Sequence, residues 1–138
     1  MHDIHIGDWV QEYSEITGNF SMPMYVSAIF ADGTIYLDFN GNEGDVWEAN
    51  IEDIAPITID KNVMEGFGFE FDFDVRDLKL KVCDNYIYIH RFQYDFNRWV
   101  VQIGENVRFT PVCSYIHELQ HAYYKYAHKP LILNWKGI

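Results

Sequence analysis

In one long segment, residues 112–127 (VCSYIHELQHAYYKYA), the apolar residues have the periodicity of a helix, whereas the pattern of the rest of the chain indicates short strands and turns. Its apolar residues, including Ile116, Leu119 and Tyr123, recur at the spacing that places them on one helical face. Pro130 prevents the helix from continuing much further. A single helix among strands can bury its apolar face by covering one side of a sheet, so the pattern predicts an α+β fold.

The N-terminal part, residues 1–59, contains β-rich runs separated by turn signals. Asp32-Gly33 stands between two such runs, and Asp-Gly in that position is a strong hairpin signal. The expected elements are strands over 4–13, 24–30, 34–39 and 46–50 and a single helical turn before Pro56. Short strands joined by tight turns over this length predict a small β-barrel.

Residues 1–59 resemble SH3-like and Tudor-like small barrels in the hairpin YVSAIFADGTIYLDF, the loop NGNEGD and the closing IEDIAPI. In Tudor-type domains, an aromatic residue and an Asn near that loop help to cage a methylated basic side chain. The resemblance carries this role to Phe39 and Asn42, and aromatic faces do attract cations. The alternative is that the aromatic residues of a small barrel only fill its interior.

The remaining part, residues 60–138, predicts an antiparallel β-meander covered by the C-terminal α-helix. Asp60 is typical of an N-cap for a short helix over 61–65 that ends at Gly66. Strands are then expected over 67–76, 78–82, 86–92 and 98–103. The whole fold is therefore expected to be an SH3-like small barrel over 1–59 followed by this helix-covered meander, together forming one compact unit.

Three carboxylates alternate along the expected strand 67–76: Glu70, Asp72 and Asp74 share one face at intervals of roughly 6.8 Å. With a formal net charge of −11, this row favours binding to a basic protein surface, including that of a nucleic-acid-binding protein. The alternative is a solvated sheet face that Lys79 and Lys81 partly neutralise across the strands.

The helical segment also contains His117-Glu118-Leu119-Gln120-His121, which matches the zinc-protease pattern H-E-x-x-H. His117 and His121 are spaced as a zinc pair, and Glu118 stands where that motif has its general base. A catalytic zinc needs a third protein ligand, and none follows at the usual spacing, since His128 comes one position late. A minimal zinc-dependent hydrolase is thus the alternative to an exposed helix face without metal.

The chain is also similar to a family of small uncharacterised proteins of bacterial mobile elements and phages. The matching segments are GNEGDVWEANIEDIAPI, IDKNVMEGFGF and YIHELQHAYY, which are distributed over residues 41–124. In those relatives Asn often stands at the position of His121, which a catalytic zinc ligand would not tolerate. The resemblance therefore favours a non-enzymatic interaction protein, without a cofactor, over the zinc hydrolase.

Charge and cysteine content narrow the expected surroundings of the protein. The net charge of −11 disfavours direct binding to nucleic acid or to an anionic membrane. Two cysteines, Cys83 and Cys113, do not make a disulfide framework. The N-terminus lacks the features of a secretory signal, and no apolar run approaches the roughly 20 residues of a membrane span. These features predict a cytoplasmic protein.

Overall fold

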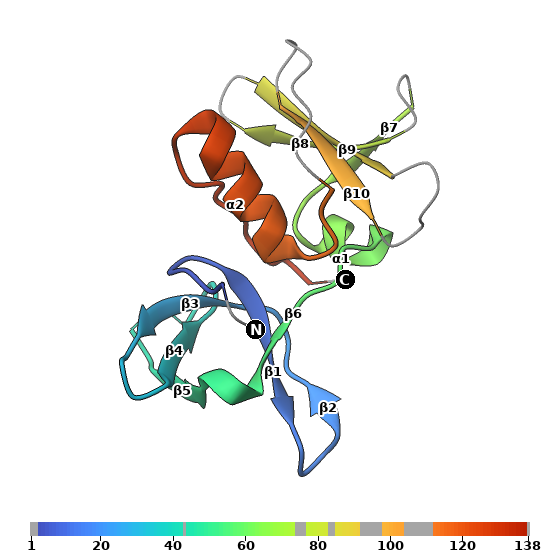
Figure 1. The fold of residues 1–138 in the computed structure, drawn as a ribbon. Helices are drawn as coiled ribbons and strands as arrows, with labels where there is room; N and C mark the ends of the chain where they lie inside the picture. Colours follow the sequence, from blue (N-terminus) through green and yellow to red (C-terminus); the bar gives the residue numbers. More distant parts are fainter. Residues whose placement is uncertain are drawn as a thin grey trace. The chain divides into compact units, whose positions relative to one another are not determined.

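The computed structural model describes residues 3–42, 44–73, 77–82, 85–91, 98–103 and 112–137. The chain forms two compact units, Met1–Ile57 and Thr58–Ile138, and each contains its own antiparallel sheet (Figure 1). A longer α-helix lies near the C-terminus, which confirms the expected α+β class. Within the described ranges, no helix combines the length and the apolar composition that crossing a bilayer requires.

The first unit is built from short strands and one 3₁₀-helix. Their bounds are β1 (Trp9–Ser14), β2 (Asn19–Phe20), β3 (Met24–Ile29), β4 (Thr34–Asp38), β5 (Trp47–Asn50), η1 (Ile51–Asp53) and β6 (Ile54–Pro56). The strands pair in the order β2-β1-β3-β4-β5, and β6 also pairs with β1. The strand expected from residue 4 begins only at Trp9, because a turn with Gly7 at φ 95° precedes it.

A short connection forces this sheet to curl. Val10 of β1 pairs with Met24 of β3 and with Pro56 of β6, so β3 and β6 lie on opposite edges of β1. In a flat sheet β5 and β6 would therefore be roughly 19 Å apart. The chain from Asn50 to Ile54 spans at most about 14 Å, and less as the 3₁₀-helix η1. The ends of the sheet are consequently drawn together, and η1 confirms the helical turn expected before Pro56.

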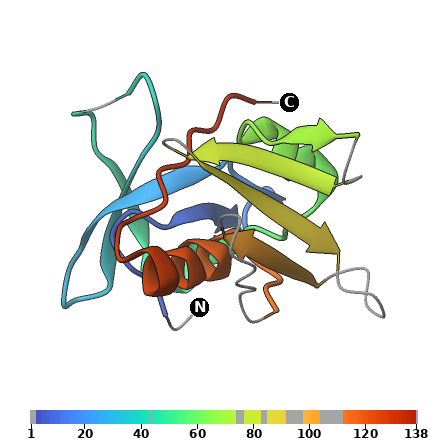
Figure 2. The same cartoon turned by 90° about the horizontal axis from the view of Figure 1, so that it is seen from above.

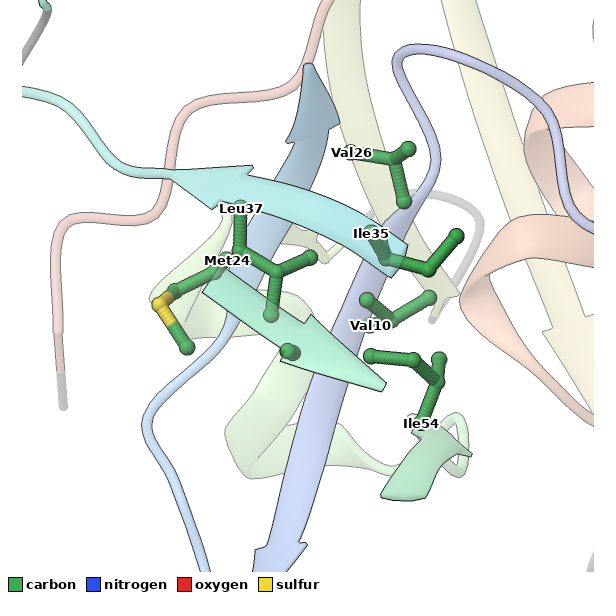
Figure 3. Close-up of a cluster of buried hydrophobic side chains, with 7 residues drawn as sticks. Val10, Met24, Val26, Ile35, Leu37 and Ile54 are labelled. Carbon is green, nitrogen blue, oxygen red and sulfur yellow. The ribbon is translucent and has the colours of Figure 1, made fainter. Parts of the chain in front are cut away.

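Apolar side chains from all of the longer strands form the core of the first unit (Figure 3). The cluster consists of Val10, Met24, Val26, Ile35, Leu37, Ala49 and Ile54. Ile35 and Leu37 are fully buried while Tyr36 between them is not, which is the alternation of a strand with one face on the core. Phe39 packs against the same cluster from the end of β4.

The hairpin expected at Asp32-Gly33 is confirmed, since it joins β3 to β4. Gly33 has a φ of 94°, a value that suits glycine because it has no Cβ. Asp32 Oδ1 accepts a hydrogen bond from the Thr34 backbone N–H at 2.9 Å. That bond stabilises the ionised carboxylate and holds the pKa of Asp32 below its ordinary value.

In its described residues the second unit is a four-stranded meander with two helices, and Figure 2 shows α2 beside β10. The bounds are α1 (Lys61–Gly66), β7 (Glu70–Asp72), β8 (Asp77–Val82), β9 (Asn85–Arg91), β10 (Trp99–Ile103) and α2 (Ile116–Ala127). The strand order is β10-β9-β8-β7, as expected for successive antiparallel strands. Leu78, Ile89 and Val101 align across three strands and are buried, and α2 packs against β10.

The short helix α1 begins as the sequence predicts and ends differently. Asp60 Oδ1 accepts a hydrogen bond from the Val63 backbone N–H at 2.8 Å, which confirms the N-cap. Gly66 is the last helical residue rather than the residue after the helix, and Gly68 adopts the positive φ, 95°. A Cβ on Gly66 would lie 2.3 Å from the Trp135 ring, so Gly66 allows close packing.

The strand expected over 67–76 is wrong in extent. Among its described residues only Glu70–Asp72 is a strand, because the turn at Gly68 interrupts the alternation before it. Within β7 the expected orientation holds, since Phe71 pairs with the buried Leu78. Phe67 and Phe69 are buried, whereas Phe71 is 43% exposed and Phe73 is 84% exposed. Residues 74–76 lie outside the described residues.

The helix α2 begins four residues later than the sequence predicts. Cys113 forms a β-bridge with Trp99, with N–H···O distances of 2.8 and 2.7 Å. Tyr115 forms a second bridge with Thr58. These pairings hold residues 113 and 115 extended, so the helix starts at Ile116.

Candidate functional site

The two histidines of the HELQH segment lie one turn apart on α2. Their ring centroids are 5.6 Å apart, with ring planes at 78°. His117 also stacks on Tyr115, with centroids 5.8 Å apart. His121 is half-buried and His117 is only 8% exposed, so the expectation of an exposed face is wrong for His117.

The buried face of α2 differs from the expected one. The buried residues of α2 are Ile116, His117, Leu119, Gln120 and Tyr123. At 100° per residue, the centre of this set lies roughly 70° from the centre of the expected apolar face, because the set includes His117 and Gln120.

Glu118 caps the helix on which it lies. Its Oε1 atom accepts hydrogen bonds from the backbone N–H groups of Ser114 at 2.9 Å and Tyr115 at 3.0 Å. These are donors next to the first turn, where a helix lacks internal partners, and a carboxylate there also opposes the positive end of the helix dipole. The residue that the motif assigns as general base is thus engaged by its own backbone.

A zinc ion at HELQH stays a prediction. Among the described residues of 58–138, no third His, Cys, Asp or Glu has a ligand atom within 4.8 Å of those of His117 and His121. His128, the nearest later histidine, is the residue at which α2 ends, in the left-handed conformation at φ 59°. A catalytic zinc requires three protein ligands, and the described part of this unit places no third one beside the two histidines.

The outward side of the second sheet carries charged and aromatic side chains, and we call it the polar face. It alternates with the buried row and comprises Glu70, Asp72, Asp77, Lys79, Tyr86, Tyr88, His90 and Gln102. Lys79 Nζ lies 3.2 Å from Asp72 Oδ2 and 4.9 Å from the centre of the Tyr86 ring. The hydrogen bond to Asp72 raises the pKa of Lys79 above its ordinary value.

The predicted acidic row is only partly open on this face. Glu70 is exposed, but the Asp72 side chain is 12% exposed and paired with Lys79. Asp74 lies outside the described residues. The neutralisation by Lys79 that the sequence offered as an alternative is therefore present at Asp72, and binding through the row stays a prediction.

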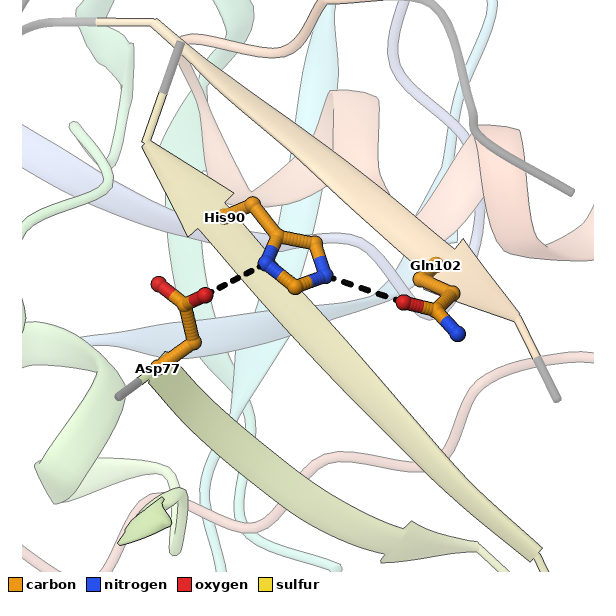
Figure 4. Close-up of polar contacts among 3 residues, drawn as sticks. All are labelled: Asp77, His90 and Gln102. Carbon is orange, nitrogen blue, oxygen red and sulfur yellow. Dashed lines mark hydrogen bonds and ion pairs between the residues drawn. The ribbon is translucent and has the colours of Figure 1, made fainter. Parts of the chain in front are cut away.

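A three-residue polar link, which sequence reasoning missed, crosses the polar face (Figure 4). His90 Nδ1 lies 2.6 Å from Asp77 Oδ2, and His90 Nε2 lies 3.1 Å from Gln102 Oε1. The side chains come from β8, β9 and β10, so the imidazole cross-links three strands. The proximity of Asp77 and His90 could have been predicted from the apolar alternation of the two strands. If Leu78 is placed opposite Ile89, Asp77 lies opposite His90. With both ring nitrogens engaged, His90 is held as a structural link rather than offered as a base.

The loop assigned to a Tudor-type cage is held by its own hydrogen bonds. Asn42 Nδ2 donates to Asp38 Oδ1 at 3.1 Å and to the Asp45 backbone oxygen at 3.2 Å. Asp38 Oδ1 also accepts from the Phe39 backbone N–H at 2.8 Å. Because Asn42 shapes the loop and Phe39 packs on the core, both residues have structural roles here. A methylated ligand at this loop stays a prediction.

The net negative charge belongs to one unit. Residues 1–57 contain eleven Asp and Glu residues and no Lys or Arg, whereas residues 58–138 contain ten acidic and ten basic residues. The formal net charge of −11 therefore belongs to the first unit, and the second unit is formally neutral. The absence of Lys and Arg from residues 1–57 is visible in the sequence, but the structure is needed to show that these residues form a separate compact unit.

A comparison of the chain with protein-family models found no match, and comparisons with curated proteins and with solved structures found none either.

Proposed function

We propose that this chain is a non-enzymatic acidic interaction protein that binds a basic protein surface through its first unit. One observation carries the proposal: the eleven acidic residues of 1–57 have no Lys or Arg beside them in the sequence of that unit. Such a unit has a negative potential that attracts cationic partners and accelerates their encounter. A nucleic-acid-binding protein is one class of partner with the required positive surface.

Several of these carboxylates are available for such contacts. Those of Glu15, Asp45, Glu48 and Glu52 belong to exposed residues. Others have internal roles: Asp8 and Asp38 are buried and accept backbone hydrogen bonds, and Glu12 accepts one from the Trp47 indole at 3.1 Å. The exposed group is therefore the part of the charge that a partner could contact.

The second unit is expected to attract a cationic partner less strongly than the first unit does. Its acidic and basic residues are equal in number, and two carboxylates of the polar face, on Asp72 and Asp77, are already engaged by Lys79 and His90. A carboxylate paired with a lysine, as Asp72 is with Lys79, attracts a distant cation less strongly. We therefore place the contact on the first unit and keep the row at Glu70 as the competing location.

We also propose that the first unit is an SH3-like small barrel. The supporting features are the strand order, the curl of the sheet and the 3₁₀-helix η1 that leads into β6 beside β1. An origin in a mobile element or phage remains a proposal that rests on sequence resemblance. Zinc-dependent hydrolysis remains the second candidate, favoured by the adjacent rings of His117 and His121 and opposed by the capping role of Glu118.

Binding of a fluorescent poly-L-lysine peptide to the full chain tests the proposed location. One variant, Glu15→Lys/Glu48→Lys, reverses two exposed charges of the first unit. Its matched control, Glu65→Lys/Glu70→Lys, reverses two exposed charges of the second unit and changes the net charge equally. We expect the first variant to weaken binding about tenfold at low salt, and the control to weaken it by less than about threefold.

The two variants separate three explanations. Equal weakening by both would mean that net charge alone governs binding and would refute a localised site. A larger loss in the control would move the contact to the polar face and so restore the row at Glu70. Thermal unfolding of each variant checks that the fold is retained.

A further inference from the structure

The β1–β2 hairpin exposes several large apolar side chains within ten residues of each other. Ile16 at its turn is 98% exposed and Phe20 is 57% exposed, and Tyr13 and Met22 are exposed as well. We call these four residues the apolar hairpin surface. The turn extends away from β3, β4 and β5 of the same unit (Figure 1). Contiguous exposed apolar side chains are a mark of interaction surfaces.

The backbone under this surface is held by hydrogen bonds. Ser21 Oγ accepts a hydrogen bond from the Glu12 backbone N–H at 2.9 Å, and the Ser21 backbone N–H donates to the Glu12 carbonyl oxygen at 2.8 Å. At the turn, the Gly18 backbone N–H donates to the Ser14 carbonyl oxygen at 2.8 Å. A surface that is already ordered loses less conformational entropy when a partner binds.

Two aromatic rings of this surface, Tyr13 and Phe20, lie on the same face of the hairpin. Tyr13 and Phe20 are directly paired across the strands, and their ring centroids are 5.1 Å apart. The pair leaves Phe20 largely exposed, so the ring contact does not bury it. Because β2 pairs with β1 alone among the described strands of its sheet, the surface lies at an edge of the sheet.

The negative charge of the first unit favours one kind of binding partner for this surface over another. A second copy of the chain would bring together two units that each carry eleven acidic residues and no Lys or Arg. Glu15 stands beside Ile16 and is exposed, so like charges would meet at the contact itself. Like-charge juxtaposition disfavours such a pairing. A partner that combines apolar and cationic side chains is favoured by both properties of the hairpin.

We propose that the apolar hairpin surface docks a basic protein segment in which Lys or Arg residues alternate with large apolar residues. This inference rests on the proposed function, because it takes the partner of the first unit to be basic. It adds that the apolar side chains of the partner contact Ile16 and Phe20 while its cations face the surrounding carboxylates. Affinity then depends on the hairpin, and attraction at long range depends on the charge of the unit.

Two synthetic peptides of equal length and equal charge serve as probes for the full chain. One alternates lysine with leucine, and the other alternates lysine with serine. The test variant is Ile16→Ser/Phe20→Ser, and its matched control is Ile132→Ser/Tyr124→Ser, which removes one exposed aliphatic and one exposed aromatic side chain from the second unit. All four substituted residues are exposed, so we expect the fold to be retained, and thermal unfolding checks this.

We expect the unchanged protein and the control variant to bind the lysine–leucine peptide about tenfold more tightly than the lysine–serine peptide. The hairpin variant should lose this preference and keep its affinity for the lysine–serine peptide. A preference that persists in the hairpin variant, or that the control variant also loses, would overturn the inference.

Failure of the proposed function has a different result. In that case the lysine–serine peptide is either not bound or bound equally well by Glu15→Lys/Glu48→Lys. A second copy as the occupant would appear as a dimer in light scattering that Ile16→Ser/Phe20→Ser converts to a monomer, and this too would overturn the proposed partner.

Discussion

The capping role of Glu118 makes a prediction that separates a structural carboxylate from a catalytic one. Glu118→Ala removes the acceptor of two backbone N–H groups, those of Ser114 and Tyr115. A hydrogen bond to a charged group contributes about 1.5–3 kcal/mol, but these groups are not fully buried and water can replace part of the loss. Typical losses of a helix cap are about 1 kcal/mol. We therefore expect the free energy of unfolding to fall by about 1–2 kcal/mol.

The conservative variant and a control on the other helix refine this expectation. Glu118→Gln keeps a side-chain oxygen as acceptor and loses only the charge near the helix N-terminus, so it should cost less than about 1 kcal/mol. Glu65→Ala removes a glutamate whose side chain forms an exposed ion pair at 4.0 Å with Lys61, and should cost less than about 0.5 kcal/mol. The expected order of destabilisation is Glu118→Ala, then Glu118→Gln, then Glu65→Ala.

Urea unfolding gives these free energies, and amide hydrogen exchange measured by NMR locates the effect. In Glu118→Ala the amides of Ser114 and Tyr115 should exchange faster than in the unchanged protein, because their acceptor is gone. Unchanged stability together with unchanged exchange at both amides would refute the capping role. A residue that acts only as a general base would give that result, since removing it affects turnover rather than folding.

Two further predictions concern the second unit. Gly66→Ala should destabilise the protein by about 1 kcal/mol, although alanine favours helices, because the new Cβ would lie 2.3 Å from the Trp135 ring. The same substitution should cost less in a Trp135→Leu background, where that ring is absent, and thermal unfolding of the two single variants and the double variant measures the difference. Protein purified without added metal should contain less than about 0.2 zinc ions per chain, because a catalytic zinc needs three protein ligands. Elemental analysis that finds one zinc per chain, lost in His121→Ala, would instead support the hydrolase.

Local signals in the sequence predict the parts of the fold that local physics determines. Asp32-Gly33 predicts its hairpin because the turn needs a positive φ and the aspartate side chain accepts a backbone hydrogen bond within the turn. Asp60 predicts the start of α1 because a helix N-terminus needs an acceptor within three residues. In both cases the residues that form the structure are neighbours in the chain.

Features that depend on distant partners are predicted less well. The row of phenylalanines from Phe67 to Phe73 alternates along its whole length, yet the turn at Gly68 and the end of β7 leave Phe73 exposed. Residues 112–115 have helical periodicity, but the bridges of Cys113 with Trp99 and of Tyr115 with Thr58 hold residues 113 and 115 extended. Pairing across the sheet overrides the periodicity in these segments, and periodicity alone contains no information about pairing.

The distinction between local patterns and distant partners also explains why we propose a contact on the first unit instead of on the acidic row. Glu70, Asp72 and Asp74 attract attention because they alternate on one strand, which is a local pattern. Whether a carboxylate remains available depends on what lies across the strands, and at Asp72 that is Lys79. The charge of residues 1–57 has no such compensation within the unit, because the unit contains no Lys or Arg to form an ion pair. Potential at a distance follows uncompensated charge rather than the number of carboxylates. We therefore propose that a partner attracted by this charge meets the first unit, and that the exposed apolar side chains of the β1–β2 hairpin then form the stable contact.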